Sequence, residues 1–143
     1  MKQTLPRIVG LTLLLVLLTP ALIAQEVNLA QFRDEQPVIL VFARNRDDDR
    51  PFMVNLDLST VWSGVAAREI HVMDVDPVSY DVELAAEQLE LGNREFAVVL
   101  IARDGTTLTV TDENTSVSEL FQILDDYQHD NYQHDDNEQG ERE

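Results

Sequence analysis

The chain has 143 residues, of which 27 are acidic and 10 are basic, and a formal net charge of −17 at pH 7. Nucleic acids and anionic lipid surfaces bind proteins that neutralise their negative charge, so this composition excludes both as partners. The chain contains no cysteine, which excludes thiol–disulfide chemistry and leaves packing to stabilise the fold.

The first 24 residues have the layout of a secretory signal peptide. Lys2 and Arg7 provide a positive start, and the apolar run Ile8–Leu18 is too short to span a bilayer comfortably. We expect cleavage after Ala24, or after Ala21 as the alternative, and a periplasmic or secreted protein that no longer contacts the membrane. Without Lys2 and Arg7, 8 basic residues remain against 27 acidic ones, a net charge of −19.

The first half of the mature chain predicts a strand followed by a helix. Val38–Ala43 (VILVFA) is a continuous apolar run, typical of a strand that is covered on both faces. After a charged stretch, Pro51 can open a helix over 51–67. Apolar residues recur along it at helical spacing, namely Val54, Leu58, Val61, Trp62 and Val65. We expect Trp62 to pack in the core.

The second half predicts two helices and a hairpin. Ile70–Val75 indicates a strand, and Asp81 can cap a short helix that Gly92 ends. Phe96–Ala102 (FAVVLIA) is a second buried run, and Asp104–Gly105 then signals a hairpin to a half-buried edge strand.

The last helix is expected over 116–127, because Ser116 and Glu119 form a capping box. Beyond Gln128 the apolar pattern stops and the motif YQHD occurs twice. A segment this polar cannot bury enough apolar surface to offset the conformational entropy that it loses on ordering. We therefore predict a domain over 25–128 and a disordered acidic tail over 129–143.

The resulting order, β-α-β-α-β-β-α, predicts an α/β fold of the thioredoxin-like type, with a four-stranded mixed sheet and helices on both faces. The two fully apolar runs should be neighbouring central strands. The helices over 51–67 and 116–127 should share one face of the sheet.

Several segments resemble the bacterial domain of unknown function 4174 family: Phe32–Arg33, VILVFA, the aspartates after it, FAVVLIARDG and SVSELFQILD. The resemblance extends from Leu29 to Asp126. It implies a thioredoxin-like fold without an established activity, and related domains occur in animal extracellular-matrix proteins with sushi repeats. The chain departs from the family pattern at Arg103, where many members have lysine, and in its YQHD tail, which replaces a Met-Pro-rich end.

Thioredoxin-like enzymes place a nucleophilic cysteine between the first strand and the first helix, where the helix N-terminus lowers the thiol pKa. The corresponding segment here, Arg44–Arg50, has no sulfur, and no proline precedes Phe96 where such enzymes carry a cis-proline. Peroxidase, disulfide reductase and isomerase activities are therefore excluded.

The same loop is the candidate site for a ligand or partner. Its charged residues are Arg44, Arg46, Asp47, Asp48, Asp49 and Arg50. The arginines could hold a carboxylate or phosphate beside the helix amides. The alternative is a solvated loop in which Asp49 serves the helix start.

We predict no metal site and no cofactor. Consecutive aspartates without a glycine do not supply the geometry of a calcium loop. His129 and His134, with Asp130 and Asp135, stand five residues apart, which is wrong for one face of a helix.

The leading functional hypothesis is a redox-inactive, non-enzymatic module that binds an envelope protein or a small anionic ligand through the Arg44–Arg50 loop. One alternative is a non-thiol enzyme in the same cleft, with Asp74 and Asp76 as acid and base. The other is an acidic protein that buffers ions through its tail.

The leader makes a direct prediction. Protein recovered from the periplasm or medium of a native-like host should begin at Gln25 when its N-terminus is sequenced. Recovery of intact Met1 in the membrane fraction would contradict the assignment.

Overall fold

The computed structural model describes residues 25–140, with side chains described through Asn131. The predicted leader lies outside these residues. The elements are a 3-10 turn (Leu29–Phe32), β1 (Val38–Ala43), α1 (Arg50–Thr60), α2 (Trp62–Ala67), β2 (His71–Val75), α3 (Val82–Gln88), β3 (Phe96–Ile101), β4 (Thr107–Thr111) and α4 (Val117–Gly140). Within residues 25–140, no helix has the length and apolar character that crossing a bilayer requires.

The four strands form one mixed sheet in the order β2-β1-β3-β4. β1 pairs with β2 in parallel and with β3 in antiparallel orientation, and β3 pairs with β4 in antiparallel orientation. Every residue of β1 and β3 is buried. The predicted mixed sheet, with the two apolar runs as central neighbours and β4 at an edge, is confirmed.

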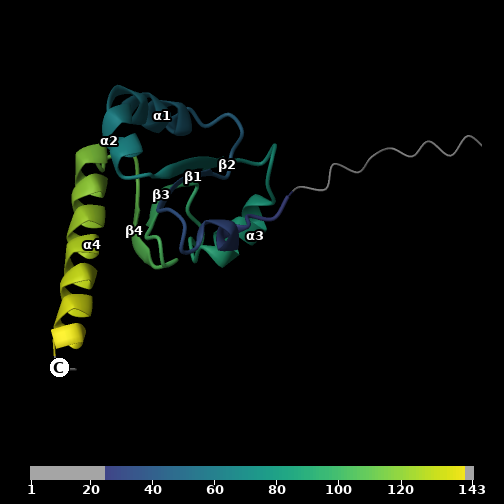
Figure 1. Ribbon diagram of the computed structural model, residues 1–143. Helices are drawn as coiled ribbons and strands as arrows, with labels where there is room; N and C mark the ends of the chain where they lie inside the picture. Colours follow the sequence, from purple (N-terminus) through teal and green to yellow (C-terminus); the bar gives the residue numbers. More distant parts are fainter. Residues whose placement is uncertain (1–24, 141–143) are drawn as a thin grey trace, which may run out of the picture.

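Helices cover both faces of this sheet (Figure 1). One apolar layer joins the strands to Leu58 of α1, Val65 of α2, and Leu120 and Leu124 of α4. The other layer joins them to α3 and to the segment before β1. The expectation that the first and last helices share a face is therefore confirmed.

The first half of α4 packs closely on α2. A Cβ atom at Gly64 would lie 2.7 Å from the Phe121 ring, so only glycine permits this approach without a shift. The Arg68 guanidinium lies 4.3 Å from the centroid of that ring and donates to both Asp125 oxygens, at 2.9 and 2.6 Å. These contacts fix α4 against the helical layer.

The helix expected over 51–67 is interrupted at Val61, and the prediction for Trp62 is wrong. The backbone at Val61 leaves the helical region (φ −119°, ψ 28°), which separates α1 from α2. As a result Trp62 is 58% exposed, while Val65 remains buried. A single uninterrupted stripe would have placed both side chains in the core.

The short helix α3 also ends before the residue that the sequence suggests. Its N-terminus is capped as predicted, because Asp81 Oδ1 accepts from the Leu84 N–H at 3.1 Å. The left-handed residue at the C-terminus is Glu90 (φ 55°), and the Leu91 N–H then bonds the Ala86 carbonyl at 2.8 Å. This pair of features is a Schellman ending with a non-glycine residue.

The last helix is longer than predicted, since α4 continues to Gly140 where we expected disorder from 129 onwards. No proline or glycine occurs between Ser116 and Gly140, and extending an established helix adds one hydrogen bond for each residue fixed. The C-terminal part of α4 projects past the rest of the domain (Figure 1). Whether the domain needs this part in order to fold stays a prediction.

Deleting residues 129–143 should lower the thermal midpoint by less than about 4 °C, because Leu120 and Leu124, the buried residues among the described side chains of α4, precede the cut. Leu124→Ala in the full chain is the contrasting variant. It should cost about 2–5 kcal/mol and lower the midpoint by roughly 10 °C or more. Similar losses in both variants, measured by circular dichroism melts, would show that the tail is part of the fold.

Candidate functional site

The Arg44–Arg50 loop leaves the carboxyl end of β1 and enters the N-terminus of α1. Because β1 and β2 are parallel, the carboxyl end of β2 lies at the same edge of the sheet. A hollow of about 450 Å³ opens there. Its lining comes from the ends of β1 and β2, the loop, α1 and the segment after β2. The residues are Val41, Ala43, Asn45, Arg46, Asp48, Pro51, Phe52, Asn55, Asp74, Val75, Asp76 and Val78.

Arg44 does not face this hollow. Its guanidinium donates to the Gly92 carbonyl at 2.8 Å and to the Arg94 carbonyl at 3.2 Å, and it forms an ion pair with Glu83. The hydrogen bond and charge of Glu83 raise the pKa of Arg44, and the side chain is only 17% exposed. Arg44 therefore joins the end of β1 to α3 and to the segment before β3.

Arg50 is committed to Asp48 in the same loop. Its Nε and Nη2 atoms donate to the two Asp48 oxygens at 2.9 and 2.6 Å, and its backbone N–H bonds the same carboxylate at 3.0 Å. These bonds hold the pKa of Asp48 below its usual value, and its side chain is 7% exposed. The guanidinium also lies 4.8 Å from the centroid of Phe96.

The other three charged residues of the loop, Arg46, Asp47 and Asp49, are exposed. The backbone N–H of Asp47 bonds Asn45 Oδ1 at 3.0 Å, which closes a local turn. Asp49 occupies the N-cap position of α1, but its side chain accepts no capping hydrogen bond. The expectation that the Asp49 side chain caps the helix is therefore wrong. The carboxylate that accepts from the first helical N–H, that of Arg50, belongs to Asp48.

The end of β2 supplies two more carboxylates to the hollow. Asp74 accepts both of its contacts from the Asn55 amide, at 2.9 and 3.0 Å. Asp76 accepts from the backbone N–H groups of Val78 and Ser79, at 2.7 and 3.1 Å. All of these donors are neutral, so none of them offsets the negative charge of the two carboxylates.

Sequence reasoning missed the exposed apolar side chains beside the hollow. Phe52 is 68% exposed, Met53 51% and Leu56 46%, all on the outer side of α1. Val78, which lines the hollow after β2, is 57% exposed. A signal was available, because Phe52 and Leu56 are four residues apart and form a second apolar stripe beside the one that contains Leu58.

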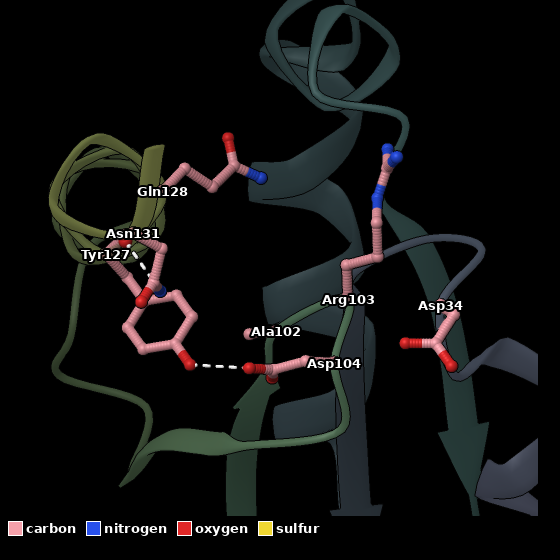
Figure 2. Close-up of a pocket in the computed structure, with 7 residues that line it drawn as sticks. All are labelled: Asp34, Ala102, Arg103, Asp104, Tyr127, Gln128 and Asn131. Carbon is pink, nitrogen blue, oxygen red and sulfur yellow. Dashed lines mark hydrogen bonds between the residues drawn. The ribbon is translucent and has the colours of Figure 1, made fainter. Parts of the chain in front are cut away.

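A second hollow, of about 230 Å³, lies between the β3–β4 turn and α4 (Figure 2). The Tyr127 hydroxyl donates to the Asp104 carboxylate at 2.7 Å, and this bond together with the Thr106 N–H lowers the pKa of Asp104. The Asn131 side chain donates to the Tyr127 carbonyl at 3.0 Å. The bond from Tyr127 to Asp104 therefore attaches α4 to the hairpin.

Across the described residues, no three histidine, cysteine, aspartate or glutamate side chains gather closely enough to hold a metal ion. The side chains of His134 and Asp135, considered above as partners of His129, lie outside the described set. The carboxylates of the loop are instead distributed between Arg50, neutral donors and solvent.

The chain is similar in structure to a reduced 2-Cys peroxiredoxin from Plasmodium vivax. The two match with a TM-score of 0.58 over 74% of this chain and 85% of that chain, at 19% sequence identity. A likeness at that identity concerns the fold alone, and it confirms the thioredoxin-like prediction. The search of curated proteins gave no match.

The family model for the domain of unknown function DUF4174 matches residues 28–131. The match includes both central strands, the Arg44–Arg50 loop and α1, and it bears out the resemblance drawn from the sequence. It covers well over half of the chain, and the chain therefore belongs to the DUF4174 family.

Proposed function

We propose that this chain is an exported, redox-inactive module of thioredoxin-like fold that binds a protein partner in the bacterial envelope. Export is inferred from the leader-like first 24 residues, and redox inactivity from the absence of cysteine. The carrying observation is the concentration of exposed apolar side chains on the α1–α2 segment and beside the hollow at the carboxyl ends of β1 and β2. Among the described side chains, the large apolar ones with the most exposure are Phe52, Met53, Leu56, Val61, Trp62 and Val78.

Four of these side chains form what we call the α1 face: Phe52, Met53, Leu56 and Val78. Phe52 and Val78 line the same hollow from α1 and from the segment after β2. Leu56 adjoins both Phe52 and Met53 on the helix, because residues four and three apart are surface neighbours. Exposed apolar groups gathered around a hollow are typical of a protein-binding surface.

Of the two ligands that the sequence suggests, the geometry favours a protein over a small anion. Arg44 and Arg50 already bind Glu83 and Asp48. An anion in the hollow would meet Arg46 alone among the loop arginines, and it would also meet the carboxylates from the end of β2. That field opposes an anion, whereas exposed apolar surface gains free energy when a protein covers it.

The alternative of an enzyme that uses carboxylates in the same hollow has less support. A general acid or base works best with a pKa near the operating pH. Asp48 is the most enclosed carboxylate of the loop, and Arg50 moves its pKa in the opposite direction, towards permanent ionisation. The observations therefore favour binding over acid–base catalysis.

The loop arginines should differ in what their loss does. Arg50→Ser should destabilise the domain by about 1–3 kcal/mol, because it leaves the enclosed Asp48 carboxylate without its partner. Arg44→Ser should cost less, about 0.5–1.5 kcal/mol, because the acceptors of Arg44 lie in exposed residues that water can reach. Arg46→Ser should change the unfolding free energy by less than about 0.5 kcal/mol, because that side chain is exposed. Urea denaturation of the three variants makes the comparison. Unchanged stability of Arg44→Ser or Arg50→Ser would return those arginines to the candidate ligand set.

The binding surface can be tested in the producing cell. A photo-crosslinking residue in place of Leu56 should form a covalent adduct with one envelope protein, which mass spectrometry identifies. The matched control is the same residue in place of Glu87, which is exposed on α3 at the opposite face of the sheet. Adducts that are equal at both positions, or absent at Leu56, would contradict the proposal.

A further inference from the structure

The α1 face is bordered by carboxylates that form no close ion pair with the described side chains. Asp49 and Asp57 stand four residues before and after Met53, so helical spacing places all three on one side of α1. Both aspartates are exposed. Asp74 and Asp76 line the hollow beside Phe52. None of these four aspartates forms an ion pair with any described side chain within residues 25–131.

The cations near this face do not balance those charges. Arg50 lies 2.6 Å from Asp48 and 3.7 Å from Glu113, so its charge is already matched. Arg44 is paired with Glu83. Arg46 is the remaining arginine of the loop, against four unpaired aspartates. The apolar centre therefore has a rim of net negative charge.

We infer that the partner presents a basic, apolar segment: a bulky apolar side chain that enters the hollow between Phe52 and Val78, flanked by lysine or arginine. This inference rests on the proposed function and adds the chemistry of the partner. The apolar side chain would cover the hollow, and the cations would meet Asp49, Asp57 and the carboxylates from the end of β2. Interfaces with an apolar centre and complementary rim charges gain both affinity and a faster encounter.

A second copy of this chain fits the surface poorly. Apposing two α1 faces would bring one acidic rim against another, on chains that each carry a formal charge of −17. Like charges facing each other across an interface oppose association. The rim thus selects against self-association and in favour of a cationic partner.

The test uses the mature protein and three short, acetylated and amidated peptides of equal length. In the first, leucine alternates with lysine; in the second, leucine alternates with glutamate; in the third, serine alternates with lysine. Fluorescence anisotropy at physiological ionic strength should give the leucine–lysine peptide an affinity at least about tenfold above both others, since each lacks one of the two contributions.

Three double variants locate the binding. Asp49→Asn with Asp57→Asn should weaken binding of the leucine–lysine peptide by about fivefold, since each substitution removes one exposed ion pair with a peptide lysine. Glu35→Gln with Glu87→Gln removes the same net charge from exposed positions away from the α1 face and should leave the affinity within about twofold of the parent, by the screening of distant charges. Met53→Ser with Leu56→Ser should also weaken binding.

Equal losses in the two acidic pairs would reduce the effect to net-charge attraction and overturn the inference. Preference for the leucine–glutamate peptide would overturn it as well, and so would self-association of the protein in sedimentation at these concentrations. If the leucine–lysine peptide does not bind while the residue at position 56 still crosslinks to an envelope protein, the inference of a basic partner is wrong and the proposed binding function stands. Absence of that crosslink counts against the binding function itself.

Discussion

The position of every helix depends on the burial of β1 and β3 on both faces of the sheet. Each of these strands contributes alternate side chains to two apolar layers, one under α1, α2 and α4 and the other under α3. A chain without cysteine has no covalent support for this arrangement, so the helices are held to the sheet by packing and by a few directed contacts. The contact of Arg68 with Phe121 and Asp125 is one of these. Because β1 is fixed so firmly, the loop that leaves it has a defined starting point.

That loop occupies the place where thioredoxin-like enzymes carry their reactive thiol, and here it is organised by internal charge pairing. The Arg44 side chain points away from the hollow and bonds the segment before β3. The Arg50 side chain bonds Asp48 at the N-terminus of α1. What remains at the surface is an apolar helix face beside carboxylates that accept only neutral donors. The loop therefore offers apolar and acidic surface instead of a nucleophile, which suits the binding function proposed above.

Much of the fold follows from local patterns in the sequence. The runs Val38–Ala43 and Phe96–Ala102 are apolar enough to require cover on both faces, and Asp104–Gly105 defines the hairpin between β3 and β4. The site is different, because its organisation depends on contacts between distant residues. The contacts of Arg44 with Glu83 and Gly92 depend on the packing of α3 against the sheet. No periodicity in the loop reveals those partners.

The helices show the same division. Asp81 caps α3 through a hydrogen bond three residues away, so the sequence is sufficient there. By contrast, the break at Val61 turns Trp62 outwards, and no glycine or proline marks that position. The exposed stripe of Phe52 and Leu56 has a readable spacing. The spacing alone does not say which of the two stripes of α1 faces the core, and in the structure the stripe with Leu58 is the buried one.

The most direct measurement of the central claim, that the α1 face binds a protein, is oxidative footprinting of methionine in the purified mature protein and in the intact cell envelope. Met53 is 51% exposed on that face, and Met73 of β2 packs against the opposite apolar layer and serves as the internal reference. If the α1 face binds a protein, Met53 should be strongly labelled in the purified protein. In the envelope it should be clearly protected relative to Met73. Equal labelling of Met53 in the two settings would contradict the claim.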